Sequence, residues 1–182
     1  PARGLAFVAR ELLKRLKMPM ELATAAILGM GKVGAGVARI LYTEGIRIMA
    51  VGDVTGAVYC RSGLHIPGLL EHLRQGKLLC DYQDAGVQHI TNDELLRLEC
   101  DILVPAALEC QLCEKNAGEI GAKIIIEGAH CPTTWKADEI LAERGVVVVP
   151  DILANAGGMI VSYFEWVQNI QSLMWDEDEV NR

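Results

Sequence analysis

The chain has 182 residues, a formal net charge of −7 and 51% hydrophobic residues. A chain of this length folds as one domain with a sizeable core and needs no disulfide or metal ion to hold it together. The acidic balance argues against nucleic acid as a partner, because neutralising phosphates requires a basic face. A membrane is not an expected partner either. No apolar run approaches the roughly 18 residues of a membrane span, and the longest aliphatic block, 146–149, ends at Pro150.

Hydrophobic spacing divides the chain into alternating helices and strands. Leu5, Val8 and Leu12 recur at helical spacing in the first segment. Thr91 and Glu94 have the spacing of a capping box ahead of an apolar run, which predicts a short helix there. In chain order we further predict a helix over 3–17, a strand over 24–29, a helix over 33–44, a strand over 46–53, a turn-rich segment over 55–63, a helix over 67–75, strands over 102–107 and 123–127, a helix over 137–144, a strand over 146–150 and a long helix over 156–175.

The predicted strands are continuously apolar rather than alternately polar and apolar. Such strands are buried on both faces, which indicates a largely parallel sheet between two layers of helices. The sequence has no internal repeat and no low-complexity linker. The fold class predicted is therefore α/β, a single domain with a doubly wound, mostly parallel sheet of the Rossmann-like kind.

The chain begins at Pro1 within a pattern that already predicts a helix, and it ends in a charged, helix-like segment, 175–182. We therefore expect residues 1–182 to be excised from a longer protein, so that any targeting signal lies outside them.

The cysteine spacing does not support a four-thiolate zinc site, because it contains no second CxxC, and no metal site is expected. Cys110 and Cys113 are interpreted as reduced, apolar positions in one helical turn, with a redox pair as the alternative. The alternating pattern favours an intracellular protein, so we expect a cytoplasmic location, with the mitochondrial matrix as the alternative. The six cysteines are Cys60, Cys80, Cys100, Cys110, Cys113 and Cys131.

A glycine motif closes the first predicted strand and opens the following helix. Gly29, Gly31 and Gly34 fit the pattern G-x-G-x-x-G, in which the glycines permit a tight turn, a close approach to a pyrophosphate and close packing of helix on strand. Asp53 ends the next strand, where a carboxylate accepts hydrogen bonds from an adenosine ribose and repels a 2′-phosphate. The motif predicts NAD as cofactor. The positive charge of Lys32 in the same turn weakens the predicted preference for NAD over NADP, so NADP is not excluded. The predicted contacts are Gly29, Met30, Gly31, Lys32, Val33, Gly34, Asp53 and Val54.

The chain resembles a known family over nearly all of its 182 residues. The most specific stretch is Ser-Tyr-Phe-Glu-Trp at 162–166, and it is similar to the glutamate dehydrogenases rather than to the leucine or phenylalanine dehydrogenases of the same fold. The other matching segments are Pro-Ala-Ala-Leu-Glu at 105–109, Glu-Gly-Ala at 127–129, Pro-Thr-Thr at 132–134, Ala-Asp-Glu-Ile at 137–140 and Asn-Ala-Gly-Gly at 155–158.

This resemblance implies roles for five further residues. Ala106, Ala107 and His130 correspond to positions near the nicotinamide end of the cofactor, and Asn155 to the residue that holds its carboxamide. Ser162 corresponds to the serine that donates to the side-chain carboxylate of the substrate. The alternatives are Asn155 as the N-cap of the last helix and Ser162 as a helix residue that points to water.

The resemblance also implies a modified sheet with one strand reversed, and an enzyme that interconverts glutamate with 2-oxoglutarate and ammonia. The cofactor carries the hydride. The family's catalytic lysine and aspartate lie in an N-terminal substrate domain, so residues 1–182 are expected to be the dinucleotide-binding domain, with no catalytic residue and no activity alone. The full-length protein is expected to be a homo-hexamer.

Two departures from the family pattern keep other functions open. The family usually has asparagine at Lys32, and asparagine and glycine at His130 and Cys131. These changes favour, as an alternative, a catalytically silent dinucleotide-binding regulatory module. A dehydrogenase for another amino acid is the third hypothesis, and the retained Ser162 argues against it.

Overall fold

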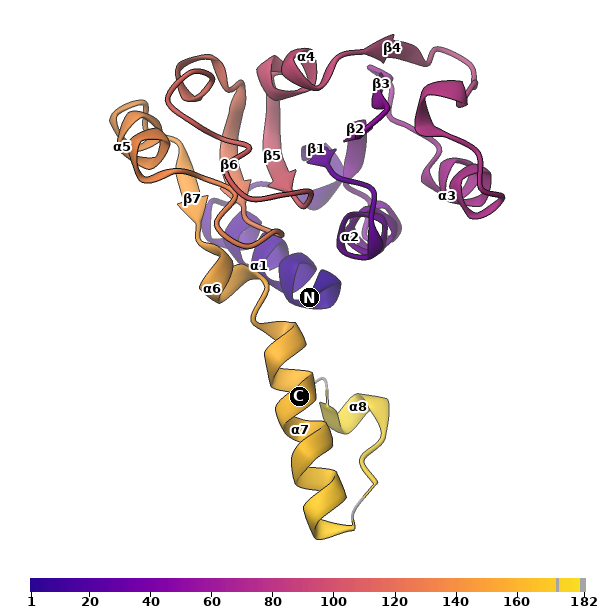
Figure 1. Ribbon diagram of the computed structural model, residues 1–182, viewed down its shortest axis with the longest axis vertical. Helices are drawn as coiled ribbons and strands as arrows, with labels where there is room; N and C mark the ends of the chain where they lie inside the picture. The colour runs from indigo at the N-terminus through magenta and orange to yellow at the C-terminus, as the bar shows by residue number, and fades with distance from the viewer. Residues whose placement is uncertain (173, 181–182) are drawn as a thin grey trace.

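The computed structural model describes residues 1–172 and 174–180, and its centre is a seven-stranded sheet (Figure 1). The strand order is β4-β3-β2-β1-β5-β6-β7, so that β4 and β7 form the two edges. The strands are β1 (Thr24–Leu28), β2 (Arg47–Asp53), β3 (Gly56–Tyr59), β4 (Gln88–Ile90), β5 (Cys100–Pro105), β6 (Ala122–Ile126) and β7 (Val147–Val149).

The strand directions confirm the mostly parallel sheet. β1 pairs in parallel with β2 and β5, and β6 pairs in parallel with β5 and β7. β3 is antiparallel to both of its neighbours, β2 and β4. Among the seven described strands β3 alone is therefore reversed, as the family resemblance implies.

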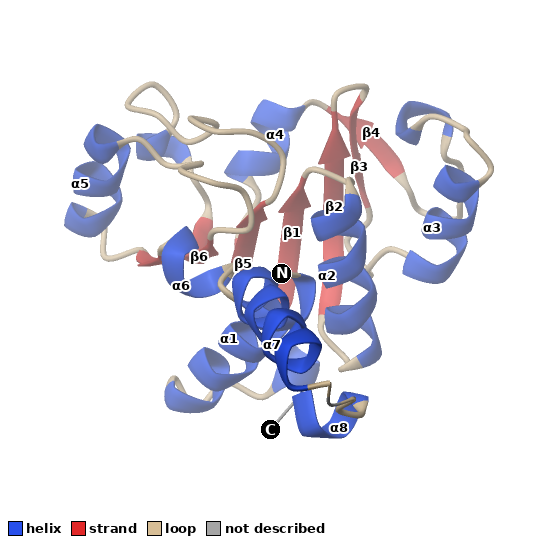
Figure 2. Cartoon of the chain, turned by 60° about the horizontal axis from the view of Figure 1, so that its bottom comes forward, coloured by secondary structure: helices blue, strands red, loops and turns tan. Residues whose placement is uncertain are grey.

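Helices cover both faces of the sheet. α1, α2 and α3 supply buried side chains to one core, and α4 and α5 to a second core on the opposite face. Figure 2 shows α1 and α2 on the near side of the strands and α4 behind them. The helices are α1 (Ala2–Arg15), α2 (Lys32–Thr43), α3 (Ile66–Arg74), α4 (Asn92–Arg97), α5 (Trp135–Glu143), α6 (Asp151–Ala154), α7 (Gly157–Gln171) and α8 (Glu177–Val180).

The central strands divide their side chains between the two cores. In β1, Ala25 and Ile27 belong to the α1–α3 core, whereas Ala26 and Leu28 belong to the α4–α5 core. All five residues of this strand are buried. Successive strand residues point to opposite faces, so a strand covered on both sides is apolar in a continuous run, here Ala25–Leu28. The doubly wound arrangement predicted from the apolar runs is confirmed.

Two strands differ from the prediction. The segment 55–63, expected to be turns, contains β3, and β4 had no predicted counterpart. β3 has only four residues and begins at Gly56, whose φ of +130° favours glycine. β4 is a three-residue edge strand whose Gln88 and His89 are exposed. Neither segment has an apolar run long enough to indicate a strand.

The last predicted helix, 156–175, is shorter than expected. α7 ends at Gln171, and Ser172 takes a left-handed conformation with φ of +52°. A short separate helix, α6, precedes it after Pro150. The charged C-terminal segment, 175–182, contains the short helix α8, and residues 181–182 lie outside the described residues.

α7 extends away from the layered part of the molecule (Figure 1). None of its described residues is buried. Its first turn crosses the start of α1, where a Cβ atom on Gly4 would lie 3.4 Å from the main-chain nitrogen of Gly157, the first residue of α7. The crossing brings the start of α7 next to the carboxyl edge of the sheet.

Candidate functional site

The glycine motif forms a tight turn between β1 and α2. The amide of Gly29 donates to the carbonyl oxygen of Gly52 at 2.7 Å. Gly29 has a φ of +107°, and a Cβ atom there would lie 2.6 Å from the backbone of Ala106. A Cβ atom on Gly34 would overlap the carbonyl oxygen of Gly29, whereas none of the described atoms lies within 4 Å of one on Gly31. The first and third glycines are thus required by packing, and the second faces open space.

The N-terminus of α2 has no side-chain cap. Gly31 is the N-cap residue and has no side chain to accept a hydrogen bond. The first main-chain bond of the helix runs from Ala35 N to Gly31 O at 2.9 Å. The amides of Lys32, Val33 and Gly34 therefore have no intrahelical acceptor. Free amides at the positive end of a helix dipole suit a phosphate group.

A cleft of about 540 Å³ opens beside this turn. It brings together side chains from the ends of separate elements: the first turn of α2, the loops after β5 and β6, and the start of α7. Six of the predicted site residues line it, namely Val33, Ala106, Ala107, His130, Asn155 and Ser162, together with Pro1, Leu108, Glu109, Gly128, Ala129, Gly158 and Met159.

The other predicted residues lie outside this cleft. Met30, Gly31 and Lys32 line a separate hollow of about 460 Å³ that also includes residues of α3. Gly29 and Gly34 lie inside the turn itself. Val54 is 97% exposed just beyond the end of β2.

Asp53 lies at the carboxyl end of β2, as expected for a ribose-binding acid. Its Oδ1 atom accepts hydrogen bonds from Thr55 N at 2.7 Å and Thr55 Oγ1 at 2.6 Å. Asn92 Nδ2 donates to the main-chain oxygen of Asp53 at 2.8 Å. These contacts fix the carboxylate, and among the described residues no donor is assigned to Oδ2. That oxygen is placed to accept a hydrogen bond from a ligand hydroxyl.

Asn155 follows α6 as its C-cap, and the N-cap of α7 is Ala156. The alternative role of Asn155 as N-cap of the last helix is therefore wrong. Its main-chain oxygen accepts from Gly158 N at 3.3 Å, while the residue lines the cleft. Ser162 is exposed one turn into α7 and lines the same cleft.

A carboxylate network holds the loop that carries His130. Glu127 is buried and accepts from Asp151 N at 2.9 Å. Asp151 Oδ2 in turn accepts from Cys131 N at 2.8 Å and lies 3.7 Å from His130 Nδ1. Asp151 thus connects the loop after β6 to α6. The His130 side chain itself is 90% exposed.

Some cleft residues were not predicted as site residues. Leu108, Glu109 and Met159 are exposed. Leu108 and Glu109 belong to the family-like segment 105–109, which was the available signal for them, whereas Met159 has none. Gly128 and Ala129 both donate to the carbonyl oxygen of Pro105 at 2.9 Å. Gly128 and Ala129 belong to the family-like segment Glu-Gly-Ala at 127–129, and this resemblance is the sequence feature that could have identified them as cleft residues.

The interpretation of Cys110 and Cys113 as parts of a helical turn is wrong. Cys110 has a left-handed φ of +53°, and both cysteines lie in the loop after β5. Asn116 holds this loop, since its Oδ1 accepts from Cys113 N at 2.9 Å and its Nδ2 donates to Gln111 O at 2.9 Å.

Residues 1–172 and 174–180 contain no group of three or more histidine, cysteine, aspartate or glutamate side chains suited to a metal ion. No helix in this part of the chain has the length and apolarity needed to cross a membrane.

Comparison with known proteins gives a consistent result. The chain is 42% identical over 185 residues to the NADP-specific glutamate dehydrogenase of Synechocystis sp., a match that covers 98% of this chain and 43% of that protein. It is also 42% identical over 181 residues to the NAD-specific glutamate dehydrogenase A of Halobacterium salinarum, covering 100% of this chain and 41% of that protein. The chain therefore spans about two fifths of the length of these relatives.

A solved structure extends the comparison to the fold. The hetero-hexameric glutamate dehydrogenase of Thermus thermophilus, in its Leu-bound form, superposes with a TM-score of 0.89 at 31% identity, covering 99% of this chain and 42% of that chain. The model of the Glutamate/Leucine/Phenylalanine/Valine dehydrogenase family matches residues 1–182. The chain belongs to this family of amino-acid dehydrogenases.

Proposed function

We propose that residues 1–182 are the dinucleotide-binding domain of a glutamate dehydrogenase, which interconverts glutamate with 2-oxoglutarate and ammonia. The observation that carries the proposal is the cleft, in which Val33 of the glycine turn lies on one cavity with Asn155 and Ser162. A dinucleotide that binds with its pyrophosphate at the α2 N-terminus can extend into this cleft. There it would meet the side-chain amide of Asn155 and the hydroxyl of Ser162. The named relatives, which are NAD-specific and NADP-specific glutamate dehydrogenases, support the same function.

Each residue has one binding task in this proposal. The free amides at the start of α2 hold the pyrophosphate, and Asp53 accepts from the adenosine ribose. Asn155 offers a donor and an acceptor to the nicotinamide carboxamide. Ser162 donates to the side-chain carboxylate of glutamate. The bound cofactor supplies the hydride acceptor and donor.

The chain carries no catalytic residue in this proposal, because its groups bind and orient rather than transfer protons. The catalytic groups belong to a substrate domain that closes over the cleft, and the whole protein assembles as a homo-hexamer. The isolated chain should bind dinucleotide and form no NADH from NAD and glutamate. Measurable glutamate-dependent NADH formation by the purified chain would contradict this division of tasks.

Replacing Gly31 with alanine tests the pyrophosphate site directly. The backbone at Gly31 has a φ of −70°, which alanine adopts, and its Cβ atom meets open space. Stability should therefore stay within about 0.5 kcal/mol of the wild type. The affinity for NAD should fall about tenfold, because the added methyl group occupies the path of the pyrophosphate.

The matched control is Gly118→Ala, since Gly118 also faces open space but lies in the short 3-10 helix Ala117–Glu119, which contributes no residue to the cleft. Titration calorimetry with NAD should show wild-type affinity for this control. Equal NAD affinities for Gly31→Ala and the wild type would show that the pyrophosphate does not bind at the α2 N-terminus. That result would contradict the proposed function.

Replacing Asp53 with serine should change the cofactor preference. Asp53 Oδ1 is held by Thr55, which leaves Oδ2 for a ribose hydroxyl. The substitution removes that acceptor and the charge that repels a 2′-phosphate. We expect the NAD affinity to fall about tenfold and the NADP affinity to rise, measured by fluorescence titration with each reduced cofactor. An unchanged ratio of the two affinities would show that Asp53 does not face the ribose.

A further inference from the structure

Two exposed cysteines lie next to each other at the edge of the cleft. Cys110 directly follows Glu109, and Cys131 directly follows His130. Glu109 and His130 both line the cleft, one from the loop after β5 and the other from the loop after β6. The amide of Cys110 donates to the carbonyl oxygen of Cys131 at 3.0 Å. The two loops are therefore joined at these two cysteines.

The loops stay together beyond the cysteines. Leu112 and Thr133 form a parallel bridge two residues farther along each loop. Leu112 N donates to Pro132 O at 2.9 Å, and Thr134 N donates to Leu112 O at 2.9 Å. These contacts, between residues 110–112 of one loop and 131–134 of the other, fix the separation of the two backbones.

This separation suits a disulfide bond. Covalent geometry around the hydrogen bond from Cys110 N to Cys131 O, at 3.0 Å, places the two Cα atoms roughly 5–6 Å apart. Disulfides span Cα separations of roughly 4.4–6.8 Å. Both cysteines also have left-handed backbones, with φ of +53° at Cys110 and +43° at Cys131. Left-handed conformations are unfavourable for residues with a Cβ atom. The intrinsic backbone preference of cysteine therefore does not account for the conformation of either residue.

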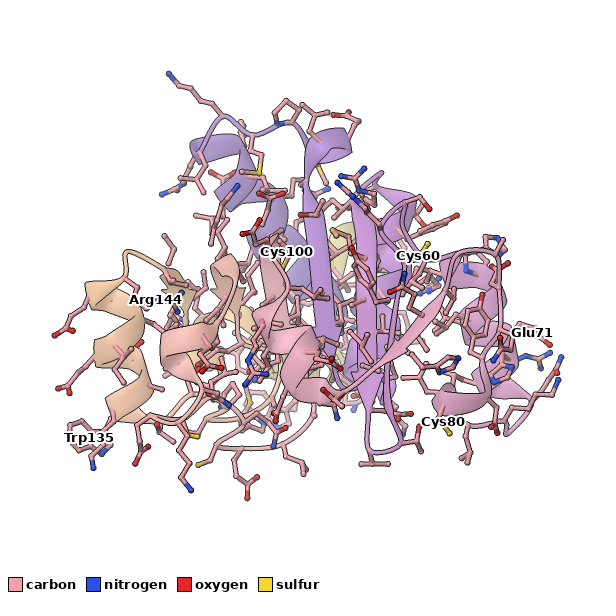
Figure 3. The ribbon with its side chains drawn as sticks, turned by 90° about the horizontal axis from the view of Figure 1, so that it is seen from above. Cys60, Glu71, Cys80, Cys100, Trp135 and Arg144 are labelled. Carbon is pink, nitrogen blue, oxygen red and sulfur yellow. The ribbon has the colours of Figure 1, made fainter. Side chains whose placement is uncertain are left out.

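The other cysteines differ in burial and position. Cys60 and Cys100 are buried, and burial raises the pKa of the Cys100 thiol to about 12. Cys80 is exposed but lies at the α3 end of the molecule, opposite to Trp135 of α5 (Figure 3). Cys113 is half-buried in the same loop as Cys110 and is the one competing partner near it.

We propose that Cys110 and Cys131 are a thiol–disulfide modification site that reversibly joins the two loops lining the cleft. The oxidant is a small disulfide such as oxidised glutathione. A thiolate of one cysteine attacks a glutathione sulfur, forms a mixed disulfide and releases one glutathione thiolate. The second cysteine then attacks the protein sulfur of the mixed disulfide and releases the second glutathione. Two protein thiols become one disulfide, and one glutathione disulfide becomes two thiols.

The bond changes the cleft through Glu109 and His130. A disulfide between 110 and 131 holds both loops in the arrangement described here, so less freedom is lost when a ligand binds between them. The oxidised chain should therefore bind NAD about threefold more tightly than the reduced chain. This part of the proposal rests on the proposed function, whereas formation of the bond does not.

The test is oxidation of the purified chain with a glutathione redox buffer, followed by alkylation of free thiols and peptide mapping by mass spectrometry. The wild type should give one cross-linked peptide pair joining 110 to 131, and dithiothreitol should remove it. Cys113→Ser and Cys80→Ser should keep the link. Cys131→Gly should abolish it without loss of the fold, because glycine favours the left-handed backbone at that position.

Absence of the link in the folded wild type, or a link from 110 to 113, would overturn the proposal. NAD titration of the oxidised and reduced wild type measures the effect on the cleft. A link at 110–131 with equal NAD affinities overturns the effect on the cleft and leaves the modification site. A link with no NAD binding in either form contradicts the proposed function alone.

Discussion

Gly34→Ala is expected to destabilise the chain by about 3–5 kcal/mol, the range of the most damaging single substitutions. A Cβ atom at this position would overlap the carbonyl oxygen of Gly29 and lie 3.5 Å from the Ile27 side chain. The atom in the way is backbone, so no rotamer change relieves the overlap. α2 must move away from β1, and the turn that presents the free amides is lost with it.

Urea denaturation followed by circular dichroism measures the loss of stability as a lower midpoint. NAD binding should fall below detection in the same variant, because the turn no longer holds its shape. Gly31→Ala, three residues earlier in the same motif, should keep the wild-type midpoint. Equal midpoints for Gly34→Ala and Gly31→Ala would show that α2 packs less closely on β1 than described here.

Asp101→Asn is expected to cost about 2 kcal/mol without affecting NAD affinity. Asp101 Oδ2 accepts from Thr24 N and Thr24 Oγ1, each at 2.9 Å, and Oδ1 accepts from Lys123 Nζ at 2.8 Å. These three residues join the amino ends of β1, β5 and β6, at the opposite edge of the sheet from the cleft. In the asparagine variant the side-chain NH₂ group replaces one carboxylate oxygen. This NH₂ group then faces another hydrogen-bond donor, from Thr24 or Lys123, and one hydrogen bond is lost. Lys123 is 70% exposed, so solvent screening keeps the loss moderate.

The same carboxylate makes stability depend on pH. Burial alone raises the pKa of Asp101, but the donors from Lys123 and Thr24 outweigh it and hold the pKa below its ordinary value. In the unfolded chain this carboxyl titrates near pH 3.9. Its contribution is therefore complete above about pH 5 and is lost as the pH falls through the lowered folded pKa.

Urea midpoints of the wild type and Asp101→Asn should thus differ most near pH 6 and converge as the pH falls below about 4. A constant difference between pH 6 and pH 3 would contradict the lowered pKa. NAD affinity at pH 7 should be equal in the two proteins, because the substitution lies far from the cleft.

The central strands and the long helices are predictable because each depends on its own residues. After Thr24, β1 is apolar from Ala25 to Leu28, the pattern of a strand buried on both faces, and four consecutive residues are enough to indicate it. Thr91 and Glu94 form the capping box that their spacing predicts, with both reciprocal hydrogen bonds present. Such signals are local, so the sequence alone contains them.

The elements that escaped prediction depend on distant partners. β3 is a strand because Val58 pairs with Val51 and its neighbours follow in register, and the four residues alone do not indicate it. Cys110 lies in a loop because its amide bonds to Cys131, a partner in the loop after the next strand. Contacts between segments far apart in the chain leave little trace in either segment.

The residues of the candidate site also fall into those that a local sequence pattern identifies and those that only the folded structure brings together. The glycine turn and Asp53 could be found from residue type and spacing, because the motif has glycines at fixed positions and an acidic residue at the end of the next strand. Asn155 and Ser162 came from the family resemblance, and the cleft places both beside Ala106. Met159 joins the same cavity through folding alone, with no sequence pattern that marks it.

The two edges of the sheet have a consequence for how the protein behaves at high concentration. β4 and β7 are three residues each, so each edge exposes few unpaired amides and carbonyls. A growing fibril extends by adding strands to a long, flat template, and neither border offers one. Seeded aggregation of the native chain through its sheet should therefore be slow, even though the five strands between the borders are rich in aliphatic side chains.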